Sequence, residues 1–271
     1  MIEKNFDTIV LFWILIAVLL FPLLLRVKAP YGRHSSTRWG PLVNNKTAWI
    51  LMELPSLVLF ILLFLLGDWR SVSVLWIFFS FWVLHYTNRI FIFPLRTHTR
   101  GKNMPLLIML FATFFNLVNG FINGYWLGHR ARGMELGAWR MGHGAWSVEH
   151  GAYSIDWLTD PRFIIGVLLF VSGFIINQVA DNHLIGLRKG NKSGYYMPTI
   201  RLFKYISCPN FLGEIIEWTG FALMTWSLPG LSFAIWTAAN LIPRSLHHHK
   251  WYIETFPDYP KGKKAIIPGL L

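Results

Sequence analysis

The chain has 271 residues, of which 54% are hydrophobic and only 14% are charged, and its mean hydropathy is +0.43. A soluble domain usually has about 25% charged residues, so this composition favours a membrane protein. The formal net charge is +12, but the basic residues lie in short segments between apolar runs, which is typical of membrane topology and argues against a nucleic-acid partner. Cys208 is the only cysteine, which excludes intrachain disulfides and multi-cysteine metal sites.

Seven apolar runs are candidates for membrane helices. A helix needs about 20 residues to cross a bilayer, so the first five runs are long enough and the last two are marginal. Pro229 and Gly230 separate those last two runs and predict a tight turn between them, as in a helical hairpin. We therefore expect an all-α membrane protein with seven transmembrane helices in a single domain, residues 1–271. The runs are 6–25, 48–66, 72–95, 105–128, 161–182, 211–227 and 231–246.

The basic residues predict the orientation of these helices. With seven crossings, segments 26–47, 96–104, 183–210 and the tail after residue 243 share one side, and they hold most of the 25 Lys and Arg residues. Cytosolic segments carry an excess of Lys and Arg, so the N-terminus is expected outside and the C-terminus in the cytosol. The site for a soluble ligand would then face the cytosol.

The outer segment 129–158 contains a small repeat. GAW at 137–139 and at 144–146 and GAY at 151–153 recur every seven residues. Such a repeat is compatible with an interfacial segment or a lid over the helix bundle. A surface loop with aromatic anchors explains the repeat equally well, and it is the simpler interpretation.

Polar residues within the apolar runs are the candidates for function. An ionised side chain in hydrocarbon costs several kcal/mol, so such residues normally face a bundle interior or a wet cavity. With the expected topology most of them lie in the cytosolic half of the membrane, where they would converge on one polar pocket. They are Glu53, His85, Tyr86, Arg89, Asn177, Asp181, Asn210, Glu214, Glu217, Arg244 and His247 to His249.

Several of these residues have simpler interpretations. Glu53 and Arg89 could form a structural ion pair. His247, His248 and His249 would point about 100° apart on a helix, which argues against one metal site that uses all three. We expect no metal.

The polar residues of the loops and of the apolar runs favour two kinds of ligand, one soluble and anionic and one hydrophobic. Cytosolic loops rich in Arg, Asn and Tyr are suited to grip phosphates and to stack on an aromatic base. A carboxyl group in an apolar pocket stays protonated more readily and can donate a hydrogen bond, and a Tyr hydroxyl beside it completes a donor pair that polarises a carbonyl. The substrate would be a hydrophobic molecule with one polar group that arrives from the lipid.

Several strings of the sequence resemble the steroid 5α-reductase family. The resemblance covers nearly the whole chain in order. The exception is about 20 residues within 129–158, which look like an insertion relative to the animal enzymes of this family. It suggests a bacterial relative of the type 2 enzymes. The strings are YGRH (31–34), AWILMELPS (48–56), LHYTNRIFIFP (84–94), NFLGEIIEWTGFALMTWSLP (210–229), RSLHHHKWY (244–252) and FPDYPKGKKAIIP (256–268).

The resemblance implies a seven-helix enzyme that reduces the Δ4 double bond of 3-oxo steroids with NADPH. Glu53 and Tyr86 match the pair that hydrogen-bonds the steroid 3-ketone. Tyr31 and Arg33 match loop positions near the cofactor. The positions that match the NADPH pocket are Arg89, Asp181, Arg188, Tyr195, Asn210, Glu214, Arg244, His248 and Tyr252.

The chain departs from the family pattern at a few positions. Met52 stands where Gln is expected, and Tyr196 and Phe93 replace an Arg and a Tyr, so polar contacts are lost. Lys102 stands where an Arg would grip a phosphate; it keeps the charge but not the bidentate fork. These changes bear on the preference for NADPH over NADH and on the identity of the substrate, and Glu217 has no assigned role.

Two other functions remain open from the sequence. One is a related enzyme that reduces a different sterol or lipid enone, or that transfers a methyl group from S-adenosylmethionine to an isoprenylcysteine. The other is a transporter or channel, against which the absence of internal symmetry argues. We expect a monomer in a bacterial inner membrane or, in a eukaryote, in the endoplasmic reticulum.

Overall fold

The computed structural model describes residues 2–30, 32, 36–67, 73–97, 102–131, 153, 155–188 and 195–271. The chain forms two compact units, each described by itself. The first unit comprises Met1–Ser36, Arg96–Gly101 and Ile165–Leu271, and the second comprises Thr37–Leu95 and Lys102–Ile164.

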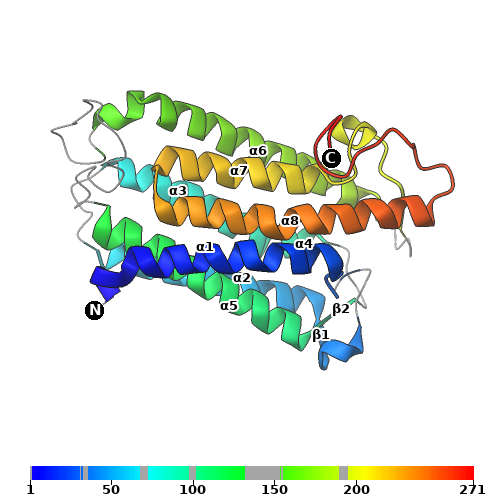
Figure 1. Ribbon diagram of the computed structural model, residues 1–271, viewed down its shortest axis with the longest axis horizontal. Helices are drawn as coiled ribbons and strands as arrows, with labels where there is room; N and C mark the ends of the chain where they lie inside the picture. The colour runs from blue at the N-terminus through cyan, green and yellow to red at the C-terminus, as the bar shows by residue number, and fades with distance from the viewer. Residues whose placement is uncertain are drawn as a thin grey trace. The chain divides into compact units, whose positions relative to one another are not determined.

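The first unit is built from long helices. Helix α8 packs against both α1 and α7 (Figure 1). The indole nitrogen of Trp236 on α8 donates to the carbonyl of Trp13 on α1 over 3.0 Å, and the two rings lie 4.5 Å apart. The elements are α1 (Ile2–Arg26), α6 (Pro161–Gly186, which begins in the second unit), the 3-10 turn η7 (Arg201–Lys204), α7 (Pro209–Thr225) and α8 (Leu228–Thr255).

The second unit centres on the pairing of α2 with α5. Among its described residues, a small sheet pairs β1 with β2 in antiparallel register, Val43 opposite Met104. The elements are the 3-10 turn η2 (Thr37–Trp39), β1 (Leu42–Asn44), α2 (Asn45–Leu65), α3 (Ser73–Thr87), the π-helical turn η4 (Asn88–Ile92), α4 (Phe93–Arg96), β2 (Asn103–Pro105), α5 (Leu106–Tyr125), the π-helical turn η5 (Trp126–Arg130) and the 3-10 turn η6 (Ile155–Thr159).

Glycines allow the backbones of α2 and α5 to touch. A Cβ atom at Gly124 would lie 2.8 Å from the Cα atom of Phe60, and one at Gly128 would lie 2.2 Å from the carbonyl oxygen of Leu63. Small residues at every fourth position permit this approach between helices in a membrane, where van der Waals packing drives association.

Glycines also allow the backbones of α6 and α7 to touch, in the first unit. A Cβ atom at Gly173 would lie 2.3 Å from the backbone nitrogen of Glu217, and one at Gly213 would lie 2.5 Å from the backbone nitrogen of Asn177. Neither position has room for a side chain. The two helices are therefore held at backbone contact near the polar residues that they carry.

Among the described residues, four helices are by length and composition able to cross a membrane: Glu3–Arg26, Asn45–Leu65, Leu106–Arg130 and Pro161–Gly186. They coincide with the first, second, fourth and fifth expected runs. Large apolar side chains on them, such as Phe12, Phe114 and Leu168, are exposed, as expected of surfaces that face lipid. The expectation of an all-α membrane protein is thus confirmed, whereas seven crossings and the orientation of the termini stay predictions.

The expected hairpin between the last two runs is present, but its turn lies earlier than Pro229-Gly230. Helix α7 ends where Trp226 adopts a left-handed conformation (φ 41°), and the Ser227 hydroxyl accepts a hydrogen bond from the Gly230 backbone over 3.1 Å. Pro229 lies in the first turn of α8, where its missing N–H costs nothing.

Most of the repeat in segment 129–158 lies outside the described residues. Its last aromatic residue, Tyr153, is buried and meets the rings of Phe78, Trp126 and Trp157 edge-on at 5.3, 5.9 and 5.4 Å. Burial raises the pKa of the Tyr153 hydroxyl above its ordinary value. Tyr153 is therefore an aromatic anchor, held among the rings of the second unit.

Candidate active site and cofactor-binding residues

Glu53 is a buried carboxyl group in the middle of an apolar helix, α2. It is 8% exposed, and its Oε1 atom lies 3.7 Å from a guanidinium nitrogen of Arg89. The ion pair that the sequence left as an alternative is thus present. A carboxyl group buried beside a cation and an amide is retained in a membrane helix for a functional or specific structural reason.

Asn116 on α5 connects Glu53 to Tyr86. The Tyr86 hydroxyl donates to the Asn116 side-chain oxygen over 3.2 Å, and the Asn116 amide nitrogen lies 3.3 Å from the Oε2 atom of Glu53. The same nitrogen donates to the carbonyl of Met52 over 2.8 Å, which fixes the orientation of the amide. The predicted pair is therefore part of a group of three.

Tyr86 and Arg89 are positioned by the change from α3 to the π-helical turn η4. The Tyr86 ring is 2% exposed and stacks on Trp82 at 5.2 Å. Trp49 donates to the carbonyl of Arg89 over 3.1 Å, and the guanidinium of Arg89 lies 4.7 Å from the centre of the Trp49 ring. π-Helical turns are frequent at functional sites, and this one directs Arg89 towards Glu53.

Sequence reasoning missed Asn116 because it singled out no polar residue of the fourth run, 105–128. Asn116, Asn119 and Asn123 are all buried on α5. Three amides at i, i+3 and i+7 in an otherwise apolar run place polar groups on one helix face, and this spacing is the signal that could have found Asn116. The fourth run therefore carries buried polar side chains on one face.

Asp181 and Asn210 form the centre of a second cluster, in the first unit. The Asn210 amide donates to the Asp181 carboxylate over 3.1 Å, and the Asn177 amide donates to the carbonyl of Asn210 over 3.0 Å. Asp181 is 7% exposed. Because α6 carries Asn177 and Asp181 and α7 begins at Pro209, these bonds fix the start of α7 against α6.

An aromatic group lies near the C-terminal end of α8. The guanidinium of Arg188 lies 5.4 Å from the centre of the Tyr195 ring, which meets Trp251 at 5.1 Å. Trp251 contacts Tyr252 at 5.2 Å. Arg188, Tyr195 and Tyr252, predicted separately, thus belong to one connected set. Tyr196 is 38% exposed.

Arg244 and His248 both contact Phe211 at the start of α7. The Arg244 guanidinium lies 5.0 Å from the centre of the Phe211 ring, and the His248 ring lies 5.6 Å from it. Glu214, one turn further along α7, is half-buried, and Glu217 is fully buried where α7 touches α6.

The three consecutive histidines point in different directions, as the helical geometry predicts. A ring nitrogen of His247 lies 3.0 Å from the carbonyl oxygen of Leu25, and the Nδ1 atom of His249 lies 2.6 Å from the Ser207 hydroxyl. Among the described residues, no group of three or more His, Cys, Asp or Glu residues is arranged to hold a metal ion.

Ser207 is a hydrogen-bonding centre that the sequence did not reveal. Its hydroxyl lies 2.6 Å from His249 Nδ1, 2.5 Å from the Tyr259 hydroxyl and 3.2 Å from the Lys264 carbonyl. Residues 206 and 264 also form a parallel bridge. The C-terminal segment is thereby held against the segment that precedes α7.

The titration of this centre is shifted by its surroundings. Burial, with a smaller contribution from Lys264 and Lys263, holds the pKa of His249 below its ordinary value. Burial raises the pKa of Tyr259 to about 12. Both groups are therefore neutral near pH 7, which suits their short contacts with Ser207.

Three predicted cofactor residues remain. Tyr31 and Arg33 lie outside the described residues. Lys102 is half-buried, and its carbonyl accepts a hydrogen bond from the Asn45 backbone over 3.1 Å, so it lies where β2 approaches the start of α2.

Comparison with known proteins gives one consistent result. Residues 102–271 match the family model described as 3-oxo-5-alpha-steroid 4-dehydrogenase. The chain is 40% identical to "Steroid 5-alpha-reductase DET2" of Arabidopsis thaliana over 89% of this chain and 87% of the relative, and 40% identical to the protein of that name from Solanum lycopersicum over 99% and 98%. It is 37% identical to "3-oxo-5-alpha-steroid 4-dehydrogenase 1" of Homo sapiens over 89% and 85%.

Proposed function

Because the chain belongs to the 3-oxo-5-alpha-steroid 4-dehydrogenase family of oxidoreductases, we propose that it reduces the Δ4 double bond of 3-oxo steroids to 5α-products. The observation that carries the proposal is the buried group of Glu53, Asn116 and Tyr86, joined by contacts of 3.3 and 3.2 Å. It offers polar hydrogens among the otherwise apolar helices α2, α3 and α5, which is the environment that a ketone on a lipid-like skeleton requires.

The reaction needs the ketone oxygen to gain negative charge. Tyr86 donates its hydroxyl hydrogen to that oxygen, exchanging the bond to Asn116. Glu53 donates as a carboxylic acid, which requires that it take up a proton and give up its 3.7 Å ion pair with Arg89. Asn116 holds both groups in place through its amide. Donors aimed at a developing oxyanion in a dry site are worth several kcal/mol, typically about 3.

The cofactor proposed is NADPH, and the residues of the first unit fit it. Arg188 and Arg244 are cations placed over aromatic rings, and the hydrogen-bonded pair of Asp181 and Asn210 lies in the same unit. Guanidinium groups suit the phosphates, and aromatic faces suit a base. When bound, NADPH supplies a hydride for C5 of the enone, and a proton added at C4 completes the reduction. Arg33, Tyr31 and Lys102 are proposed to contribute from the flanking loops.

The experiment that tests this function uses purified protein in detergent with NADPH and testosterone or progesterone. We expect the 5α-product, and we expect Glu53→Gln and Tyr86→Phe each to lower kcat by about 100-fold, the effect of removing one oxyanion donor. Glu254→Gln and Tyr205→Phe are matched controls, because Glu254 pairs with Lys250 on the surface of α8 and Tyr205 is 61% exposed. Wild-type turnover in both active-site variants would overturn the mechanism.

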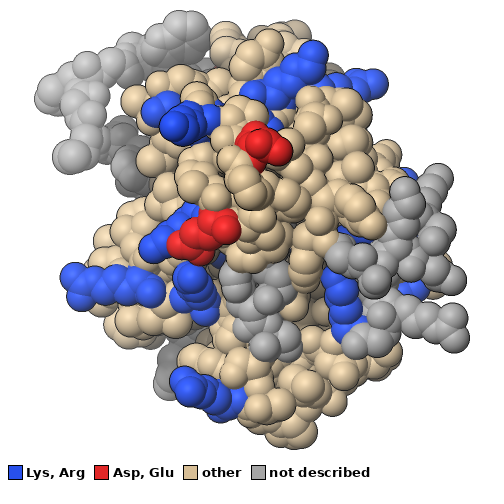
Figure 2. Space-filling view, turned by 90° about the vertical axis from the view of Figure 1, so that its right-hand side faces the viewer, with Lys and Arg blue, Asp and Glu red and all other residues tan. Residues whose placement is uncertain are grey.

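We further propose that the enzyme is a monomer that crosses the membrane seven times, with the NADPH residues facing the cytosol. Support comes from the four long apolar helices among the described residues and from the concentration of Lys and Arg in the segments between the apolar runs. On the face that Figure 2 draws, Lys and Arg side chains are more numerous than Asp and Glu. The orientation is tested by labelling Lys261→Cys, in a Cys208→Ala background, with a membrane-impermeant thiol reagent. We expect no labelling in intact cells; labelling there would place the C-terminus outside the cytosol and contradict the proposed orientation.

A further inference from the structure

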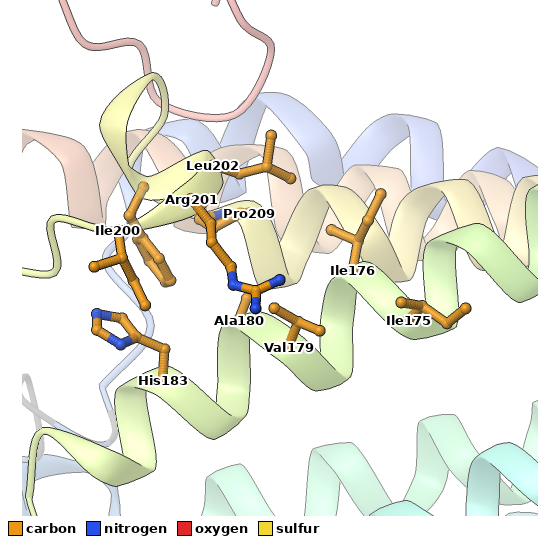
Figure 3. A pocket seen from close by; sticks show the side chains of 10 residues that line it. Ile175, Ile176, Val179, Ala180, His183, Ile200, Arg201, Leu202 and Pro209 are labelled. Atoms are coloured by element: carbon orange, nitrogen blue, oxygen red, sulfur yellow. The ribbon is translucent and has the colours of Figure 1, made fainter.

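A cavity of about 200 Å³ lies between the C-terminal part of α6 and the segment that leads into α7 (Figure 3). Its walls are mostly apolar and include Ile175, Ile176, Val179 and Phe203. Pockets for drug-sized molecules have volumes of about 300–1,000 Å³, so this one suits a single hydrocarbon chain better than a four-ring steroid.

Two basic side chains complete the cavity. Figure 3 shows Arg201 running from its segment towards α6, with the His183 imidazole beside Ile200. Within the part of the chain that the structure describes, no ion pair or hydrogen bond involves the Arg201 guanidinium, and the buried Nε2 atom of His183 has no hydrogen-bond partner. Buried polar atoms without a partner are uncommon, and this one lies at a cavity.

The backbone of Arg201 supports a role for its side chain. Its φ is +51°, in the left-handed region that glycine occupies without strain and that other residues rarely adopt. Strained non-glycine residues concentrate at functional sites. Here the strain places a guanidinium over a cavity that no carboxylate lines.

The location of the cavity points to lipid. Helix α6 is one of the four candidate membrane spans among the described residues, and residues 175–183 lie in its C-terminal half, where a spanning helix approaches the headgroup layer. Ile175 is 54% exposed and Ile200 is 43% exposed, so apolar surface continues from the cavity to the outside of the unit.

We propose that this cavity binds an anionic phospholipid. One acyl chain lies along Ile176 and Val179, the Arg201 guanidinium binds the phosphate, and His183 Nε2 hydrogen-bonds to a headgroup oxygen. Guanidinium groups match phosphate geometry with paired hydrogen bonds. Pro209, the first residue of α7, also lines the cavity, so a bound lipid braces the start of the helix that carries Asn210.

Native mass spectrometry of the detergent-solubilised full chain tests the proposal. The probes are phosphatidylglycerol, phosphatidylcholine with the same acyl chains, and oleate. We expect one tightly bound phosphatidylglycerol. Arg201→Gly should weaken it about tenfold, the value of one lost charge-assisted contact, while suiting the backbone at that position. Ile176→Trp should abolish binding by filling the cavity while leaving both basic groups.

Lys204→Ala is the matched control, because Lys204 is an exposed cation of the same 3-10 turn that does not line the cavity. It should keep wild-type affinity. Three results would overturn the proposal: equal binding of phosphatidylcholine, unchanged phosphatidylglycerol binding in Arg201→Gly, or an equal loss in Lys204→Ala. Binding of oleate without phosphatidylglycerol would also overturn it, since the occupant would then be a fatty acid.

Discussion

The Tyr86 hydroxyl donates to the side-chain oxygen of Asn116 over 3.2 Å, although the two residues lie on different helices and 30 positions apart. The only hydrogen of that hydroxyl is therefore engaged in this structure. For Tyr86 to donate to a ketone, the bond to Asn116 must be exchanged for one to the substrate. In the mechanism that we propose, Asn116 is a positioning residue that holds the Tyr86 hydroxyl until the substrate ketone replaces it.

The first prediction concerns Asn116. Asn116→Leu should lower kcat about tenfold while the KM for NADPH stays unchanged, because Tyr86 and Glu53 lose one hydrogen-bond partner. Asn116→Asp should be worse, since a carboxylate oxygen would face the carbonyl of Met52, an acceptor against an acceptor. Steady-state kinetics measures both. Thr113→Val on the same helix is the control, and an equal fall of kcat in it would remove any special role for Asn116.

The second prediction concerns the contact between Asp181 and Asn210. Asp181→Asn and Asn210→Ala should each weaken NADPH binding about tenfold, because the start of α7 is no longer fixed against α6 and a charge-assisted hydrogen bond is lost. Isothermal titration with NADPH measures the Kd. Asp258→Asn, at an exposed position, should leave it unchanged. Wild-type Kd values in both cluster variants would exclude this pair from cofactor binding.

The third prediction concerns the glycines between α6 and α7. A Cβ atom at Gly173 would lie 2.3 Å from a backbone nitrogen, so Gly173→Ala must force the helices apart. Overpacking of this kind costs about 1–3 kcal/mol of unfolding free energy. Thermal unfolding should show a clear fall in Tm. Gly186→Ala on the same helix meets no atom within 4 Å and should leave Tm unchanged or slightly higher. Equal Tm values for the two variants would contradict the packing.

The fourth prediction concerns pH. The folded-state pKa of His249 lies below its ordinary value of 6.5, so the folded protein binds a proton there less readily than the unfolded chain does. The stability that this provides is complete above pH 6.5 and decreases as the pH falls below it. Tm measured from pH 8 to pH 5 should therefore fall on the acid side.

Two variants separate the causes of this pH dependence. His249→Gln should remove the acid-side fall that comes from His249. Ser207→Ala should lower the unfolding free energy by about 1 kcal/mol at every pH, because hydrogen bonds are lost, and should keep the acid-side fall. An unaltered pH profile in His249→Gln would assign the effect to another group.

Much of this organisation follows from local patterns in the sequence. Apolar runs predicted the long helices, and the helical spacing of the histidines predicted their divergent directions. The cost of burying Glu53 and Arg89 in apolar runs predicted that they would need partners. These features depend on residues within a few turns of one another or on the solvent around them.

Other features depend on pairings that periodicity does not encode. The contact between Asn116 and Glu53 spans 63 positions, and the bond between Trp236 and Trp13 spans 223. The hairpin turn was placed too late because Pro229 was interpreted as a turn residue, although proline is equally at home in the first turn of a helix. The sequence did not reveal the role of Ser207, because a single serine before a helix is common. Its hydrogen-bond partners His249, Tyr259 and Lys264 are more than 40 positions away.

The direct contact of α6 and α7 at Gly173 and Gly213 also limits how the enzyme can vary. Between most helices a layer of side chains acts as an adjustable spacer, because rotamers and volumes change to suit the surroundings. Here the spacer is absent, so the separation of Asp181 and Asn210 is set by the dimensions of the peptide backbone itself. NADPH binding by Asp181 and Asn210, as we propose it, should therefore be insensitive to bilayer thickness, and adaptation to other substrates has to occur elsewhere in the chain.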